Sequence, residues 1–138
     1  MRSVVKTDRR EPPPEFGSAY SEDEVRAMQR AVINVFARWG VSDVDAATIL
    51  GGISAKTFRR WKDRDYGRVG RDLADRMSHL LGIHKALRII FSDPHAGYAW
   101  VRSDNAAFQG KSALEIMKYG GMEHIVRIRR YLESVRSG

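Results

Sequence analysis

Apolar side chains recur at intervals of three and four along residues 22–39, a spacing that places them on one face of an α-helix. The residues on this face are Val25, Met28, Val32, Val35, Phe36 and Trp39. Ser21 and Glu24 form a capping box at the start, in which each side chain accepts a hydrogen bond from the other residue's main-chain N–H. Gly40 follows as a C-terminal cap. The pattern predicts an amphipathic helix over residues 22–39.

Two shorter helices are predicted next. The first covers residues 44–50 and ends at the pair Gly51-Gly52, because glycine readily adopts the turn conformation that stops a helix. The second begins after Ser54, whose hydroxyl is suited to an N-cap, and runs over residues 55–64.

A longer helical pattern runs over residues 71–91 and carries apolar side chains on two faces. One face comprises Leu73, Met77, Leu80, Leu81, Leu87 and Phe91, and the second comprises Ile83, Ile89 and Ile90. A helix that is apolar on two sides is typically buried on both. We therefore expect this helix to lie at the centre of the core.

The remaining residues predict three more helices. Asp93 and Pro94 are typical of an N-cap followed by the first helical position. Residues 112–115 form a second capping box, and the helix it opens ends at Gly120-Gly121. The last helix covers residues 122–135, with an apolar face of Met122, Ile125, Val126, Leu132 and Val135. No segment shows sustained alternation of apolar and polar residues, so the predicted fold class is all-α.

The segment before the first helix, residues 1–20, contains three consecutive prolines, mixed charges and only scattered apolar residues. Such a segment buries too little apolar surface to offset the entropy lost on ordering. We expect a disordered or extended arm.

Composition narrows the class of protein. The absence of cysteine excludes disulfides, thiolate zinc sites and a cysteine nucleophile. The formal net charge is +7, which favours a polyanionic partner or an acidic protein surface. No apolar run is long enough for a membrane span, and the N-terminus does not resemble a signal peptide. We expect a cytoplasmic protein with no membrane partner.

Residues 42–64 match the helix-turn-helix pattern. Small Ala46 and Ala47 allow two helices to cross closely, while Phe58 and Trp61 dock the second helix on the first. Docking turns a basic side outward, where it would meet the major groove of DNA and the flanking phosphates. The candidate DNA-binding residues are Ser54, Lys56, Arg59, Arg60 and Lys62. The alternative is a basic helix face that meets only solvent.

The C-terminal half contains a more specific series of blocks. In chain order they are residues 80–88, Trp100, residues 105–108, Gly110-Lys111-Ser112 with Leu114-Glu115, Gly120-Gly121, and Arg129-Arg130-Tyr131-Leu132. Together they resemble the toxin-binding domain of MbcA/ParS/Xre antitoxins. An Xre-like helix-turn-helix precedes this domain in the family, so the resemblance covers most of the chain. It implies an arm (1–20), a helix-turn-helix domain (21–66) and a small helical domain for toxin binding and dimerisation (67–138).

The resemblance implies an antitoxin that forms a homodimer, binds a cognate RES-domain toxin and blocks its use of NAD, by degradation or by ADP-ribosyl transfer. It also implies repression of the antitoxin's own operon through the helix-turn-helix. A basic C-terminal helix suits this role, because arginine pairs with carboxylates or occupies phosphate subsites and tyrosine stacks on rings. The candidate toxin-binding residues are Arg127, Arg129, Arg130, Tyr131, Glu133 and Arg136. For each arginine, a solvated helix face is the alternative.

Other residues carry no pattern of catalysis or metal binding. The histidines lack the spacing of paired metal ligands, and no phosphate-binding glycine motif occurs, so we expect no metal, cofactor or enzyme activity. His84 is predicted to be a hydrogen-bonded core or dimer residue. Asn105 and Phe108 are predicted to shape their loop and fill the core, where the three tryptophans also belong.

Two functions therefore remain from the sequence. The first is an antitoxin that neutralises a RES-domain toxin and represses transcription. The alternative is a stand-alone helix-turn-helix regulator whose C-terminal domain only dimerises or senses a ligand. Toxin binding distinguishes the two, because DNA binding is compatible with both.

Overall fold

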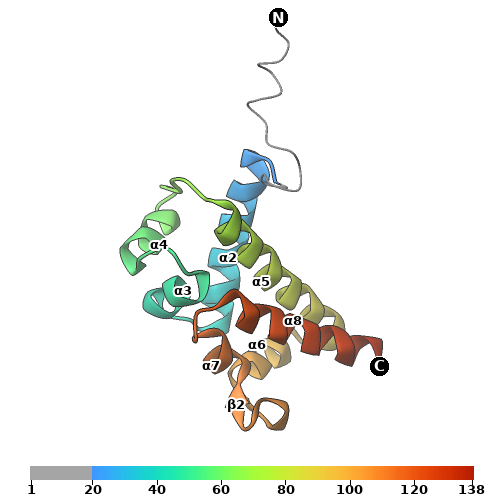
Figure 1. Ribbon diagram of the computed structural model, residues 1–138. Helices are drawn as coiled ribbons and strands as arrows, with labels where there is room; N and C mark the ends of the chain where they lie inside the picture. The colour runs from blue at the N-terminus through green and yellow to red at the C-terminus, as the bar shows by residue number, and fades with distance from the viewer. Residues whose placement is uncertain (1–19) are drawn as a thin grey trace, which may run out of the picture.

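Helices make up most of the described chain. The structure is a computed structural model that describes residues 20–138 (Figure 1), so the arm predicted over residues 1–20 lies, except for Tyr20, outside the described residues. The elements in chain order are α2 (Glu22–Trp39), α3 (Asp43–Leu50), α4 (Ala55–Lys62), α5 (Arg71–Ile90), α6 (Pro94–Arg102), β1 (Asp104–Asn105), the 3-10 helix η1 (Ala106–Phe108), β2 (Lys111–Ser112), α7 (Ala113–Met117) and α8 (Met122–Ser137). The predicted all-α fold class is confirmed, with one small strand pair added.

Local capping determines where several helices begin. The Ser21 Oγ accepts the Glu24 N–H at 3.1 Å, and the Glu24 carboxylate accepts the Ser21 N–H at 2.7 Å. Ser112 and Glu115 form the same reciprocal pair at 3.1 and 2.8 Å at the start of α7. An N-cap of this kind stabilises a helix by about 1 kcal/mol. Both predicted capping boxes are confirmed, and α2 has the predicted bounds.

Helix α5 is the centre of the fold. It packs against α2 and α3 from the N-terminal half and against α6 and α8 from the C-terminal half. Figure 1 shows α8 crossing it on the way to the C-terminus. Met77, Leu80 and Ile83 of α5 have no exposed surface. Burial of each such side chain stabilises the fold by about 2 kcal/mol, so the predicted central core helix is confirmed.

Two apolar residues that were predicted to lie in the core are exposed instead. Ile89 is 53% exposed and Val135 is 45% exposed, whereas Ile128, which the spacing left off the apolar face, is fully buried. Ile89 is turned by about 200° from the buried Leu87, away from the packed side of α5. Val135 lies beyond Leu132, the last buried residue of α8. The predicted face of α5 was therefore wrong in direction at Ile89, and that of α8 ran past the end of packing at Val135 and omitted Ile128, three residues after the buried Ile125.

A pair of two-residue strands interrupts the helices, which the sequence analysis did not predict. Strands β1 and β2 pair in antiparallel fashion, with Asn105 opposite Lys111. Two residues are too few to produce an alternating pattern. Between the strands, the Asn105 Oδ1 accepts the Ala107 N–H at 2.8 Å and Phe108 is 1% exposed. Asn105 and Phe108 therefore shape the loop and fill the core, as predicted.

The guanidinium of Arg76 connects three parts of the chain that are distant in sequence. Its Nη1 donates to the main-chain oxygens of Ile49 at 3.2 Å and Gly120 at 2.6 Å, and its Nε donates to Asp72 at 2.9 Å. Gly51 leaves room for this group, because a Cβ there would lie 2.5 Å from Nη1. One side chain, 12% exposed, thus joins the end of α3, helix α5 and the turn between α7 and α8.

Replacing Arg76 with leucine removes the donor shared by two main-chain oxygens. We expect Arg76→Leu to lower the free energy of unfolding by about 1–3 kcal/mol, measured by urea denaturation followed by circular dichroism. Arg71→Leu is the matched control, because Arg71 on the same helix pairs with Asp75 at 3.7 Å and its side chain is half exposed. The control should lose less than about 1 kcal/mol. Equal losses for the two variants would contradict this role of Arg76.

Candidate functional site

The turn between α3 and α4 depends on glycine. Gly51 and Gly52 have φ angles of +66° and +73°, in the left-handed region that other residues enter at a cost. Helix α4 then docks through Phe58 and Trp61, both nearly fully buried. The Phe58 ring lies 5.9 Å from the ring of Phe36 on α2 and 5.9 Å from that of Trp61. The predicted helix-turn-helix is therefore present, and its aromatic side faces the core.

The opposite side of α4 is basic and exposed. All five candidate DNA-binding residues lie there, namely Ser54, Lys56, Arg59, Arg60 and Lys62. Asp43 at the start of α3 restrains two of them, because its carboxylate lies 2.6 Å from the Lys62 Nζ and 3.9 Å from an Arg59 Nη. Within residues 20–138, Lys56 and Arg60 have no carboxylate partner. Asp43 was not among the predicted site residues, because its position next to α4 follows only from the folded chain.

Helix α8 carries all six candidate toxin-binding residues, spread around its solvent-facing sides. Its buried side is formed by Ile125, Ile128 and Leu132. A helix turns by about 100° per residue, so Arg127 and Tyr131 lie on one flank of the buried side and Arg129 and Glu133 on the other. Arg130 points directly away from the core. The six residues therefore do not form one cluster.

Arg127 and Tyr131 pack on aromatic side chains that precede α7. The Tyr131 ring stacks on Trp100, with centroids 6.1 Å and planes 11° apart, and meets the Phe108 ring at 5.1 Å. The Arg127 Cζ lies 5.3 Å from the centre of the Phe108 ring, a cation–π distance. Trp100 is half-buried rather than fully buried. Part of the stacking capacity of Tyr131 is therefore used within the chain.

Arg129 and Glu133 lie where α8 crosses α5. The Arg129 Nε donates to the Glu133 carboxylate at 3.1 Å, and an Arg129 Nη lies 3.1 Å from the Nδ1 of His79 on α5. Arg130 and Arg136 are exposed and have no carboxylate partner within the described residues. These two arginines are the basic groups of α8 most open to a partner.

His84 departs from the prediction of a hydrogen-bonded core histidine. Its Nδ1 is buried and has no hydrogen-bond partner in the part of the chain that the structure describes. Burial, and then the positive charges of Arg88 and Arg38, lower the pKa of His84. The ring is therefore biased toward its neutral form. A role of His84 in a dimer stays a prediction.

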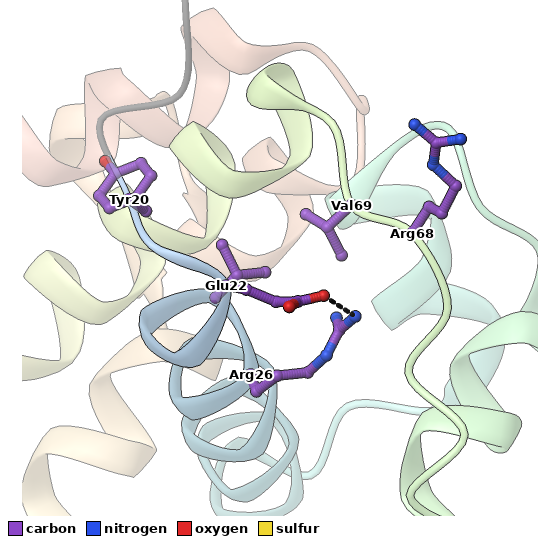
Figure 2. Close-up of a pocket in the computed structure, with 6 residues that line it drawn as sticks. Tyr20, Glu22, Arg26, Arg68 and Val69 are labelled. Carbon is purple, nitrogen blue, oxygen red and sulfur yellow. Dashed lines mark ion pairs between the residues drawn. The ribbon is translucent and has the colours of Figure 1, made fainter. Parts of the chain in front are cut away.

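A hollow of about 240 Å³ lies between the start of α2 and the segment that leads into α5 (Figure 2). Its lining consists of Tyr20, Glu22, Val25, Arg26, Arg68 and Val69, none of which is a candidate site residue. An Arg26 Nη lies 3.7 Å from the Glu22 carboxylate, which partly neutralises the guanidinium. Across residues 20–138, no three metal-binding side chains come together. No helix of this described part has the length and apolar character needed to cross a membrane.

Two family models match the chain and between them cover both surfaces. The antitoxin Xre-like helix-turn-helix domain matches residues 19–82, and the antitoxin Xre/MbcA/ParS C-terminal toxin-binding domain matches residues 86–138. The chain belongs to the Xre/MbcA/ParS antitoxin family. The "Uncharacterized protein y4oB" of Sinorhizobium fredii (strain NBRC 101917 / NGR234) is 38% identical to this antitoxin over 127 residues, which cover 91% of this chain and 98% of that protein.

The matches assign the two surfaces of the antitoxin to different domains. Helices α3 and α4 lie in the helix-turn-helix match, and α6, α7 and α8 lie in the toxin-binding match. The chain thus has the domains of an antitoxin with a toxin as its partner, and neither matched family is an enzyme family. The two matches meet within α5, the helix that packs on both halves.

Proposed function

We propose that the antitoxin inhibits a cognate RES-domain toxin by covering its NAD-consuming active site with α8 and the C-terminal tail. The observation that carries this proposal is that Arg130 and Arg136 of α8 are exposed and have no carboxylate partner within the described chain. One guanidinium binds a carboxylate or a phosphate through two parallel N–H···O hydrogen bonds. Such groups are suited to acidic side chains at the mouth of the toxin's pocket, or to the subsites that hold the NAD pyrophosphate.

The end of α8 has the shape that this mode of inhibition needs. Every residue from 133 to 138 is exposed, whereas Leu132 is still anchored in the core. The exposed segment extends roughly 8 Å as a helix. A segment that is already helical loses less conformational entropy on entering a cleft than an unstructured tail would, and this favours tight binding.

We further propose that the antitoxin forms a cytoplasmic homodimer that represses its own operon through α4. Its support is the basic exposed side of α4, in which Lys56 and Arg60 are available to phosphates and base edges. A dimer would present two such helices to two half-sites on one face of DNA. The proposed helix-turn-helix domain spans residues 21–66, and the proposed toxin-binding domain spans residues 67–138.

The toxin role is tested by NAD consumption, with the toxin encoded beside this antitoxin as the enzyme. We expect the full chain to inhibit it to saturation at a fixed molar ratio. The double variant Arg130→Ala/Arg136→Ala should need at least about tenfold more protein for half inhibition, because loss of each charge-assisted contact costs about 1.5–3 kcal/mol. Removal of residues 134–138, which are all exposed, should weaken inhibition without disturbing the core.

The matched control is Arg30→Ala/Arg68→Ala, which removes two exposed arginines that lie outside the toxin-binding match. This control should inhibit like the unchanged antitoxin. Equal inhibition by the arginine double variant would contradict the role of α8. If the full chain inhibits no neighbouring toxin at all, the stand-alone regulator becomes the better account.

The DNA role is tested by fluorescence anisotropy with the promoter DNA of the antitoxin's own operon, over a range of salt concentrations. Lys56→Ala/Arg60→Ala should weaken binding and reduce the slope of log affinity against log salt by about 2 for each α4 helix bound. Asp43→Asn should strengthen binding, because it releases Arg59 and Lys62 from their carboxylate partner. Binding that neither substitution alters would contradict α4 as the DNA-binding surface.

A further inference from the structure

Gly82 lies in the interior of α5, where glycine lowers the stability of a helix. Its backbone angles do not require glycine. Gly82 has no positive φ, unlike the turn glycines of this chain. Glycine is a poor helix former, so a glycine at such a position usually has a packing or functional reason. The reason here is the side chain of Arg129: a Cβ on residue 82 would lie 2.5 Å from the Arg129 Cζ and 2.6 Å from its Nε. The guanidinium therefore lies directly on the bare backbone of α5.

Three groups hold the guanidinium of Arg129 in this place. Gly82 provides the surface beneath it, the Glu133 carboxylate accepts from Nε at 3.1 Å, and the His79 Nδ1 lies 3.1 Å from one Nη. Arginine only donates hydrogen bonds, so the His79 Nδ1 is the acceptor and the ring is neutral, with its proton on Nε2. The Arg129 side chain is 31% exposed in this arrangement. We name Gly82, His79 and Glu133 the Arg129 seat.

We propose that the Arg129 seat fixes the rotation of α8 on α5, so that Arg129 is a positioning residue for toxin binding rather than a toxin contact. This inference rests on the proposed function of α8. Beyond Leu132 no residue of α8 is buried, and within residues 20–138 the link between Arg129 and α5 is the last polar contact of α8 with another helix before its exposed end. If α8 rotated about its axis by the angle between two successive residues, Arg130 would turn by about 100° and would no longer point directly away from the core.

The seat depends on the protonation of His79. The charged groups that act on this ring are Asp75 on its own helix and Arg129, Glu133 and the more distant Arg130 on α8. Burial, and then the charge of Arg129, lower the pKa of His79 below 6.5. At acidic pH the folded state therefore binds fewer protons at His79 than the unfolded state does. The stability that the neutral ring gives the folded state is complete above pH 6.5 and is lost as the pH falls through the lowered pKa of His79. Protonation also converts Nδ1 into a donor that can no longer accept from Arg129.

Gly82→Ala tests the seat without removing any polar group. The added methyl must displace the guanidinium, which is the flexible end of a side chain, while alanine favours the helix more than glycine does. We expect an unchanged or higher melting temperature, together with faster amide hydrogen exchange in the C-terminal turns of α8. We also expect toxin inhibition to weaken by about tenfold, the factor that corresponds to 1.4 kcal/mol. Ser78→Ala on the same helix is the control and should alter neither exchange nor inhibition.

His79 supplies a second, independent test. In His79→Asn the amide oxygen stands near the position of Nδ1 and accepts a hydrogen bond from Arg129 at every pH. This variant should therefore retain inhibition, and the protection of α8 from hydrogen exchange should not fall between pH 7 and pH 5. His79→Leu removes the acceptor and should behave like Gly82→Ala. The unchanged antitoxin should lose α8 protection on acidification over the same range.

The exchange measurements on the antitoxin alone separate failure of the seat from failure of the proposed function. If α8 exchange is the same in Gly82→Ala, His79→Leu and the unchanged chain, the seat is wrong, whatever the toxin assay gives. If exchange changes as expected but the unchanged antitoxin inhibits no toxin, the proposed function is wrong. If Arg129→Ala alone abolishes inhibition while Gly82→Ala and His79→Leu retain it, Arg129 contacts the toxin and the positioning role is overturned.

Discussion

A single largely buried guanidinium, that of Arg76, joins the helix-turn-helix half and the C-terminal half of this antitoxin. Its hydrogen bonds reach the last turn of α3 and the turn before α8. The helix-turn-helix and α8 are therefore both attached to the same position on α5. A second link lies beside it, where the Lys118 Nζ is 3.4 Å from the Asp45 carboxylate. The orientation of α4 relative to α8 follows from these contacts and from the apolar core of α5.

In this arrangement one small chain presents two basic surfaces, on α4 and on α8, that are formed by different residues. In Figure 1, α4 and the end of α8 lie on different sides of α5. On each surface some cations are held by the chain itself, Arg59 and Lys62 by Asp43 and Arg129 by its seat, while others remain exposed. In the proposed function the exposed cations are the groups that meet DNA or the toxin, while the held ones are already paired within the chain.

The local features of the fold could be predicted from the sequence, because they depend on residues close together in the chain. The capping boxes at Ser21 and Ser112, the glycine turn before α4 and the bounds of α2 are of this kind. Long-range contacts could not be predicted, since Arg76 reaches Ile49 and Gly120 across 27 and 44 residues. Spacing also misjudged Val135, because it carries no information on where packing against a neighbouring helix ends, whereas Ile128 has the right spacing and was omitted from the predicted face.

For the candidate site, the resemblance to the family pointed to the domain that contains α8 but did not distinguish among the residues of this helix. Arg129 and Tyr131 each have partners inside the chain, in His79 and Trp100, whose positions only the fold reveals. The most direct test of the account is the affinity of the antitoxin for its toxin at increasing concentrations of a non-cleavable NAD analogue. If α8 occupies the active site, the apparent Kd should rise in proportion to the analogue once its site is filled. An affinity that does not change with the analogue would contradict it.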